Sequence, residues 1–554
     1  MTTGLLGIAT SGLMAFQRNL ATTGHNIANV NTEGYSRQKA ELTERLPQFT
    51  GAGFMGNGVD VASITRSYDD FLNTQVRTST STYAGVDAYH RMATQIDNII
   101  ADQDTGLSPS LQAFFNAVQG VANDPTSIAA RQVMITQGQT LTQTFKTLNG
   151  QMDDLRDQMN QGLSSSVDEI NTLAGGIAAF NQQIVVSLGQ GGGKQPPNDL
   201  LDQRNLLLEK LSQQIDTQVV AQDDGSLNVF IGKGQSLVMG ATANTLKVQN
   251  SAYDSNQKDI ALSAGGTGSV LITDSLSGGE IGGLLDFANR VLDPAQNALG
   301  RIAVGLATQF NTQHQLGSDL TGQPGVDFFA EPTVSYSGTI FPKSGSTGTV
   351  SVNYRDANQL QASDYRLDFD GTSTYTLTRL SDNQVVARNA TGDFSGTNSV
   401  DGLDIQLTGA SSTSSFLIRP TRAAADQIAM NLTDPRQIAA AATPYAGPGD
   451  NRNALALAAL QTAPKLLNGK ASYQDAYTAI VGDVGSLTHA AEINSTAQKN
   501  LLDNATQQRD SVSGVNLDEE AANLVKFQQS YQAAAQLITV VNSTFDALIG
   551  AVRS

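Results

Sequence analysis

The sequence predicts an α+β protein in which terminal coiled-coil helices and a helical-bundle stalk carry inserted β-rich modules. Three observations support this fold class. Apolar residues recur at intervals of three and four at both ends of the chain, and long proline-poor stretches rich in Ala, Gln and Leu follow inward. Alternation with a period of two, with Gly and Asn at the turns, is concentrated in the middle. Because helices are predicted at both ends of the sequence and strands in its middle, we expect both termini to belong to one helical module.

The first helix is predicted near the N-terminus from two rows of apolar residues. Residues within a row are seven apart, and the second row follows the first by three. This spacing lines one face of a coiled-coil helix. The remaining positions are mostly Ser, Thr, Asn and Gln, which either protein or water can contact. The residues expected at an assembly interface here are Leu6, Leu13, Phe16, Leu20 and Ile27.

The last helix shows the same pattern more strongly. Asn516 is a suitable N-cap, and Glu519 three residues later completes a capping box. A helix from Asn516 to Val552 would be roughly 55 Å long at about 1.5 Å per residue. A helix that packs only within its own chain remains the alternative. The residues expected at an assembly interface here are Leu524, Phe527, Tyr531, Ile538, Val541, Phe545 and Leu548.

Between the ends, helices and strands fall into separate regions. Helices are expected over 85–103, 108–123, 126–188, 198–216, 281–316, 421–442, 453–467 and 471–511, with a possible interruption at Gly175-Gly176. Residues 217–275 and 333–420 are β-rich. The clearest strands are 226–231, 349–352, 365–369, 375–377 and 415–418.

These elements divide the 554 residues into three parts, in line with roughly 150 residues per domain. Residues 1–45 and 514–554 form a terminal coiled-coil polymerisation domain. Residues 46–332 and 421–513 form a helical stalk with a β-rich excursion at 217–275. Residues 333–420 form an inserted β-rich outer domain.

The composition excludes several classes of function. The net charge of −18 repels phosphate backbones and anionic lipids, so neither nucleic acid nor a membrane is an expected partner. Cysteine is absent, which excludes disulfides, thiolate nucleophiles and Cys-ligated metals. The N-terminus lacks the basic region and cleavage site of a secretory signal, and no run of apolar residues is long enough to span a bilayer.

No catalytic or cofactor-binding pattern is present in the sequence. Histidines occur at 25, 90, 314 and 489, each without Cys, Asp or Glu at ligand spacing, so ordinary polar or packing roles are expected. The stretch 191–194 resembles a phosphate-binding loop, but Leu188 and Gln195 stand where Gly and Ser or Thr are required. We therefore expect no enzyme activity, no cofactor and no metal.

One stretch near the N-terminus carries a family resemblance. It reads Asn26-Ile27-Ala28-Asn29-Val30-Asn31-Thr32-Glu33-Gly34-Tyr35-Ser36-Arg37-Gln38. It resembles the N-terminal signature of flagellar rod, hook and hook-associated proteins, and its Gly-Tyr-Ser-Arg-Gln ending is similar to the hook-associated protein 1 family. Gly34 is expected to supply a turn with positive φ after the first helix. The motif residues singled out are Asn26, Ala28, Asn29, Thr32, Gly34, Tyr35, Ser36 and Arg37.

The C-terminal run 515–524, followed by 527–533, resembles the partner signature of the same axial proteins. The resemblance implies a structural subunit of the extracellular bacterial flagellum that joins hook to filament and is needed for filament assembly. It implies export without a cleaved signal peptide. The implied partners are further copies of itself in a ring or short helical tube, the hook protein, the next hook-associated junction protein and an export chaperone.

Two other functions stay open at this point. The chain could be another axial protein of the hook or rod, although Tyr35-Ser36-Arg37 and the β insertion disfavour this. It could also be a secreted adhesin or enzyme whose activity resides in the β module at 333–420.

Overall fold

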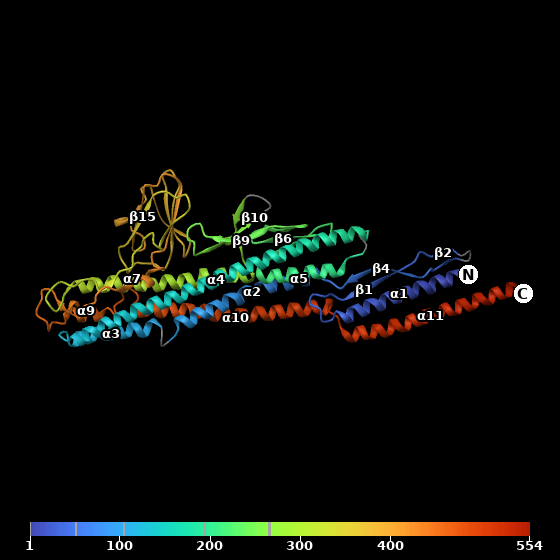
Figure 1. Cartoon of the computed structure of the whole chain (residues 1–554), viewed down its shortest axis with the longest axis horizontal. Helices are drawn as coiled ribbons and strands as arrows, with labels where there is room; N and C mark the ends of the chain where they lie inside the picture. The colour runs from blue at the N-terminus through green and yellow to red at the C-terminus, as the bar shows by residue number, and fades with distance from the viewer. Residues whose placement is uncertain (1, 50–52, 103–105, 193–194, 264–267, 554) are drawn as a thin grey trace.

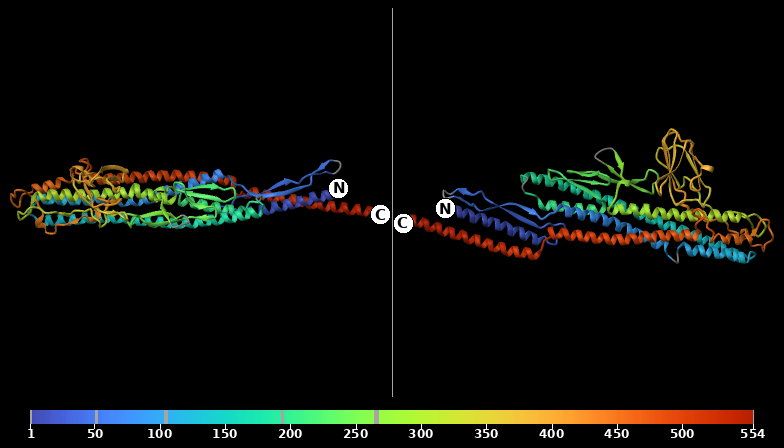
Figure 2. Two further views of the ribbon diagram at one scale, coloured as in Figure 1. Left: turned by 90° about the horizontal axis from the view of Figure 1, so that it is seen from above. Right: turned by 180° about the vertical axis from the view of Figure 1, so that it is seen from behind.

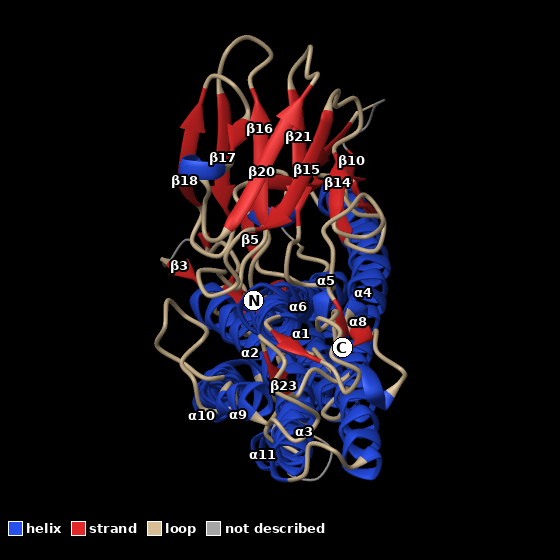
Figure 3. Ribbon diagram, turned by 90° about the vertical axis from the view of Figure 1, so that its left-hand side faces the viewer, coloured by secondary structure: helices blue, strands red, loops and turns tan. Residues whose placement is uncertain are grey.

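The computed structural model describes residues 2–49, 53–102, 106–192, 195–263 and 268–553. The chain forms a long rod with both termini at one end (Figure 1). The β-rich modules rise from one side of the rod, the outer one near the end away from the termini and the other near the middle (Figures 1 and 2). An end-on view separates the strands of the modules from the helices beneath them (Figure 3).

The stalk is a bundle of helices that run along the rod. Ser127 caps the longest helix, α4, and Asp69 caps α2, each by accepting a bond from a first-turn backbone N–H. The stalk helices are α2 (Asp70–Ile100), α3 (Leu107–Asn123), α4 (Ile128–Gln190), α5 (Asn198–Gln214), α6 (Gly279–Phe287), the π-helical turn η2 (Ala288–Leu292), α7 (Asp293–Gln315), α9 (Arg452–Ala459) and α10 (Tyr473–Ser513).

Two helices and a β-ribbon form what we call the terminal unit. Helices α1 (Thr2–Ala28) and α11 (Leu517–Arg553) lie side by side and antiparallel. The ribbon pairs β1 (Gln38–Glu44) with β4 (Val59–Arg66), and beyond them β2 (Gln48–Phe49) with β3 (Phe54–Met55). The sequence patterns did not predict this ribbon, because β1 is largely polar and exposed and β4 is only half-buried.

The β excursion lies on α4 and consists of two small antiparallel sheets in the orders β5-β6-β7-β8 and β11-β10-β9. Its strands fall within the stretch predicted to be β-rich. They are β5 (Thr217–Ala221), β6 (Leu227–Ile231), β7 (Gln235–Met239), β8 (Thr242–Ala243), β9 (Thr245–Asn250), β10 (Lys258–Ser263) and β11 (Ser269–Leu271), followed by the 3-10 turn η1 (Thr273–Ser275).

The outer β module stacks a five-stranded sheet, β14-β21-β16-β17-β18, on a three-stranded sheet, β15-β20-β19. All pairings are antiparallel. Every strand expected here is present. They are β14 (Ile340–Pro342), β15 (Thr349–Tyr354), β16 (Tyr365–Phe369), β17 (Tyr375–Arg379), β18 (Gln384–Asn389), β19 (Asp393–Phe394), the 3-10 turn η3 (Gly396–Asn398), β20 (Leu403–Thr408) and β21 (Ser414–Ile418).

The buried apolar residues form two cores. The larger core runs through the stalk helices and the β excursion, and the smaller one fills the space between the two sheets of the outer β module. Among the described residues, neither core includes a side chain of α1, α11 or the ribbon. The terminal unit is therefore a thin layer without a core of its own.

The helix predicted over 421–442 is wrong. Only α8 (Ala424–Gln427) is α-helical there, followed by β22 (Ala429–Met430), the 3-10 turn η4 (Pro435–Gln437) and β23 (Ala441–Ala442). These two short strands pair with β13 (Phe329–Ala330) and β12 (Gly317–Ser318).

The alanine content of this segment suggested a helix, but tertiary contacts hold it extended. Arg131 is fully buried and donates to the carbonyls of Pro435 and Ile438, which fixes the chain on α4. The carbonyl of Thr421 lies so close to Gly300 of α7 that a Cβ on the glycine would collide with it. Small side chains here serve close packing and not helix propensity.

The structure also tests the predicted interruption of the long helix at Gly175-Gly176 and the predicted cap of the last helix. Helix α4 continues through Gly175-Gly176 to Gln190 without interruption. Asn516 accepts bonds from the backbone N–H groups of Asp518 and Glu519, as expected of a cap, while the Glu519 carboxylate contacts Arg37.

Candidate functional site

The inner face of the terminal unit is the seam between α1 and α11. On α11, the predicted residues Leu524, Phe527, Tyr531 and Ile538 are half-buried, and Val541 is buried. Phe545 remains 47% exposed. The side chain of Leu548 lies outside the described residues. The predicted row therefore does face α1, although most of it is covered incompletely.

The matching residues of α1 are covered to a similar degree. Leu13, Phe16, Leu20 and Ile27 are half-buried, and Leu6 is exposed. One helix laid on another covers only part of each apolar row, so both helices retain exposed apolar surface.

The polar face of α1 meets the ribbon. Ser11 Oγ accepts a hydrogen bond from the backbone N–H of Val59 at 3.2 Å. Asn26 binds the backbone of Gln38 twice, donating to its carbonyl and accepting from its N–H, both at 2.9 Å. The choice left open by the sequence is thereby decided: much of the polar face contacts protein.

The family motif folds into a joint between the terminal unit and the stalk. Asn26 is buried at its centre and also donates to the carboxylate of Glu520 at 3.1 Å. Tyr35 donates to Asn26 Oδ1 at 2.7 Å, and its hydroxyl lies 3.0 Å from His25 Nδ1. Burial and the nearby carboxylates of Asp199 and Asp202 raise the pKa of Tyr35, so it remains a neutral donor.

The remaining motif residues complete this joint or border it. Asn29 bonds the His25 carbonyl at the end of α1, and Thr32 bonds Asn29. Ala28 is the exposed last residue of α1. Gly34 has the expected positive φ of 76°, and a Cβ there would lie 3.0 Å from Cβ of Leu206 on α5.

Charged groups connect the motif to the start of α11. Arg37 contacts Glu520 at 2.8 Å and Glu519 at 3.0 Å. The backbone N–H of Arg37 also donates to the carbonyl of Ser513 at the end of α10, at 2.8 Å. Glu520 is buried, so this pair is shielded from solvent on one side. Both α10 and α11 are thereby attached to the same short stretch of chain.

Charged groups also connect the motif to α5. The carboxylate of Asp202 accepts from the backbone N–H of Ser36 at 2.9 Å and from Arg66 of β4 at 2.8 Å. Burial raises the pKa of the Asp202 carboxyl, although Arg66 and the Ser36 N–H oppose the shift. A cleft of about 750 Å³ lies beside this joint, lined by residues of the motif, α5 and the α10–α11 connection.

The comparisons with known proteins follow this division of the chain. Residues 93–329 match the family model of the flagellar hook-associated protein FlgK helical domain, and residues 342–420 match that of the flagellar hook-associated protein 1, D2-like domain. At the ends, residues 6–35 match the flagella basal body rod protein model, and residues 506–551 match the flagellar basal body rod FlgEFG protein C-terminal model.

Full-length relatives decide the family. Flagellar hook-associated protein 1 of Escherichia coli (strain K12) is 36% identical over 549 residues, covering 98% of this chain and 99% of the relative. The chain belongs to the flagellar hook-associated protein 1 family. The Bacillus subtilis (strain 168) relative of the same name is 25% identical over 582 residues, covering 99% of this chain and 98% of the relative.

A solved structure agrees with the fold. The flagellar hook junction protein FlgK from Burkholderia pseudomallei is 26% identical, with a TM-score of 0.73 over 79% of this chain and 100% of that chain. The prediction of a hook-associated protein 1 drawn from the signature is thereby confirmed, as is the predicted α+β fold class. A place in the extracellular flagellum follows from this family.

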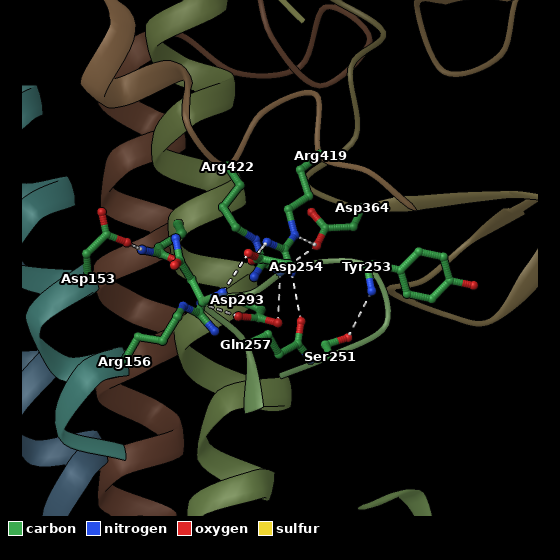
Figure 4. Close-up of polar contacts among 12 residues, drawn as sticks. Asp153, Arg156, Ser251, Tyr253, Asp254, Gln257, Asp293, Asp364, Arg419 and Arg422 are labelled. Atoms are coloured by element: carbon green, nitrogen blue, oxygen red, sulfur yellow. Dashed lines mark hydrogen bonds and ion pairs between the residues drawn. The ribbon is translucent and has the colours of Figure 1, made fainter. Parts of the chain in front are cut away.

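Within this hook-associated protein, a second polar site fixes the outer β module to the stalk (Figure 4). Arg422, which follows β21, contacts Asp364 at 2.5 Å and Asp293 at 2.8 Å. Arg419 pairs with Asp254 of the β9–β10 loop. Burial opposes ionisation of Asp293, but Arg422 and other arginines outweigh it and hold its pKa below the usual range.

This cluster joins three parts of the chain at one point. Arg156 of α4 reaches Asp293 at 2.5 Å and Gln296 at 2.7 Å, and Gln296 in turn bonds Asp153. Stalk, β excursion and outer β module therefore share one buried network. No pattern in the sequence indicated this network, because its members are separated by up to 269 positions, the distance from Asp153 to Arg422.

The described residues offer little for catalysis. They include no group of three or more His, Cys, Asp or Glu placed to hold a metal ion. His314 is buried between the carbonyl of Val326 and the N–H of Ala439, as a packing histidine would be. His25 bonds Tyr35, and His489 lies 3.3 Å from Glu492 on the exposed face of α10.

One stretch of helix is long and apolar enough to cross a membrane. Tyr473–Ala551 contains an 18-residue window with a mean hydropathy of 1.2, sufficient by length and composition to cross a bilayer, and 6% of that window is buried. A helix with apolar residues on more than one face gives the same average, so this is weak evidence. The absence of a membrane partner stays a prediction.

Proposed function

We propose that this chain is a structural subunit of the hook–filament junction, and that its terminal unit packs against further copies of the chain in a ring or short helical tube. The observation that carries this proposal is the contrast in burial. The terminal unit places apolar rows on two long helices yet contributes nothing to either core among the described residues. Burying such rows releases about 25 cal/mol per Å², so assembly has a strong driving force.

The assembled position brings further partners. The hook protein lies on one side of the ring and the next hook-associated junction protein on the other, below the filament. The residues in contact are those predicted from the two rows, together with the exposed residues that flank them. The joint built from the family motif sets the angle at which the stalk leaves the terminal unit.

Export follows from the same position. The chain reaches the extracellular flagellum through the flagellar export apparatus without a cleaved signal peptide. Before export, a chaperone covers the exposed apolar face of α11. Support for this comes from the many apolar side chains of α11 that are exposed in the single chain, Val525, Val540 and Phe545 among them.

The chain has no enzymatic role in this proposal. The outer β module and the stalk serve as structure, in keeping with relatives that are named as flagellar hook-associated proteins. Activity in the β module, as an adhesin or enzyme would show, remains the competing function and lacks a supporting cluster among the described residues.

Electron microscopy of cells that lack this gene tests the proposal, combined with an assay of flagellin in the medium. We expect hooks of normal length without filaments, and monomeric flagellin in the medium. Restoring the intact gene should restore filaments. Missing or overlong hooks would indicate a hook or rod protein, and normal filaments would refute a junction role altogether.

A further inference from the structure

The outer end of the ribbon is unusually apolar for a solvent-exposed position. Leu46, Phe49, Phe54 and Met55 are all exposed, and we call these four residues the ribbon end. Phe54 is 77% exposed. The rings of Phe49 and Phe54 contact edge to face, with centroids 5.5 Å apart, so they form one compact apolar surface.

A second apolar surface lies at the same end of the molecule, on α11. Val541 is buried toward α1, whereas its neighbour Val540 is 60% exposed and Leu537, one turn earlier, is exposed as well. At about 100° per residue, Val540 lies opposite Tyr531 and Ile538 of the row that faces α1, and Leu537 lies at the edge between the two sides. We call Leu537 and Val540 the outer stripe.

The two surfaces cannot meet within one chain. The ribbon lies on one side of α1 and α11 lies on the other, as Figure 1 and the right-hand view of Figure 2 show. Helix α1 packs against α11 and also against strands β1 and β4 of the ribbon. Helix α1 thus separates the ribbon end from the outer stripe within one chain.

The two surfaces nevertheless lie at the same height along the rod. Gly7 of α1 adjoins Asn57 of the ribbon, and the ribbon end continues from there toward the N-terminus of α1. Helix α11 runs antiparallel to α1, so its last turns flank that same N-terminus. Copies related by rotation about an axis parallel to the rod would therefore bring the ribbon end of one to the outer stripe of the next.

Two different patches on opposite sides of a subunit give a head-to-tail interface, which closes into a ring or continues as a helix. We propose that the ribbon end of one copy docks on the outer stripe of α11 in a neighbouring copy. This lateral contact rests on the proposed assembly of the terminal unit and specifies how adjacent copies join. A second copy is the fitting occupant because the chain itself carries both complementary surfaces at matching heights.

Paired cysteines test the contact in assembled flagella, because the chain has no cysteine of its own. Phe54→Cys combined with Val540→Cys should give, on oxidation, a ladder of species at multiples of the chain's own mass that collapses on reduction. The matched control combines Phe54→Cys with Lys526→Cys. Lys526 is exposed on nearly the same side of α11, about 21 Å closer to the joint.

We expect the control pair to give at most one-tenth of the cross-linked product. Equal yields from both pairs would overturn the contact. Filaments without any ladder would refute this contact and leave the junction role intact. If the unsubstituted chain is itself dispensable for filaments, the proposed function fails instead.

A second variant pair keeps the test decisive if the cysteines disturb assembly. Phe54→Ser removes an exposed ring from the ribbon end, while Phe71→Ser removes a ring that is 75% exposed at the start of α2 in the stalk. Neither change disturbs a core. We expect Phe54→Ser to release at least tenfold more flagellin into the medium than Phe71→Ser, and equal release would overturn the proposal.

Discussion

The stalk and the terminal unit are both built from long helices with apolar faces, yet they bury those faces to very different degrees. Helix α4 buries side chains on almost every turn between Met134 and Ile184, because it is packed against several other elements at once. Among the described side chains of α11, Glu520 and Val541 are buried. A heptad pattern thus predicts a helix equally well in both regions but does not reveal whether the partner comes from the same chain.

The difference also extends to polar groups. In the stalk, charged side chains form networks such as the one around Arg422, which tie separate modules together. At the joint, the charges of Arg37 and Glu519 are partly exposed. The stalk is therefore complete as a single chain, whereas the terminal unit resembles one part of a larger surface.

The largest expected difference lies in local stability before assembly. In the purified single chain, backbone amides of 1–45 and 514–554 should exchange hydrogen at least about a hundredfold faster than those of α4, because they open with roughly 3 kcal/mol less free energy. Hydrogen exchange read by mass spectrometry measures this, and protease digestion should remove the same segments first. Equal protection would show that the terminal unit is already complete alone.

Removing an aromatic ring should destabilise the stalk far more than the terminal unit. Phe310→Ala leaves a cavity beside Phe114 and Phe328 and should cost the stalk about 3–5 kcal/mol. Phe545→Ala in α11 should change the free energy of unfolding by under about 0.5 kcal/mol in the single chain. Thermal unfolding of both variants compares them, and similar losses would contradict the contrast in burial.

Breaking a charge pair should have unequal effects as well. Arg422→Gln leaves Asp293 and Asp364 buried without their shared partner and should cost about 3 kcal/mol, loosening the outer β module from the stalk. The same change at the joint, Arg37→Gln, should cost less, about 1–2 kcal/mol, because Arg37 is partly exposed and the buried Glu520 keeps its hydrogen bond from Asn26. Exchange rates of amides in β16 and β21 report the loosening. Unchanged rates there would mean that the cluster does not hold the module.

Acid should weaken the stalk through His314. Burial, with a smaller contribution from Arg131, lowers the pKa of His314 to about 4, so the folded stalk holds it neutral while the unfolded chain is protonated below about 6.5. Because the folded pKa is the lower one, the stabilisation is complete above pH 6.5 and is lost progressively as the pH falls to 4. The total loss should be roughly 3 kcal/mol.

Denaturant unfolding at several pH values measures this loss, and His314→Gln is the comparison variant. Its unfolding free energy should be lower at neutral pH but should fall less steeply between pH 6.5 and 4. Identical slopes in the two proteins would assign the acid sensitivity to other groups.

The smallest expected effect concerns the turn in the motif. Gly34→Ala forces a side chain into a positive φ and against Leu206, which should cost about 1–2 kcal/mol at the joint. Gly24 lies within α1 with no neighbour at the position of a Cβ, so Gly24→Ala should instead stabilise by about 0.5–1 kcal/mol. Thermal unfolding and hydrogen exchange of the motif amides measure both changes in stability. A loss of stability in both variants, or a gain in both, would contradict the prediction.

Much of the fold could be predicted from sequence because its signals are local. The heptads of α1 and α11, the turn at Gly34 and strands such as Tyr365–Phe369 depend on residues within a few positions of each other. The helix predicted over 421–442 failed for the opposite reason. Its local helix propensity was overridden by contacts with Arg131 and Gly300, which both lie more than a hundred positions earlier in the sequence.

The candidate site shows the same division. The motif residues were identified by resemblance, but their partners Asp202, Leu206 and Glu520 were not, since no spacing rule connects them to Asn26 or Gly34. The ribbon was missed because Ala40 is the only buried residue of β1 and β4, which leaves only a weak apolar alternation to detect.

The sequence by itself determined the helical ends, the β-rich middle and membership of an axial flagellar family, because apolar periodicity and the terminal signatures are written in consecutive residues. Only the tertiary structure decided which apolar rows are buried, how the motif joins the stalk, and that the ribbon end and the outer stripe face opposite ways at one height. Those properties depend on contacts between segments remote in sequence, and burial is a property of the folded chain that no single segment encodes.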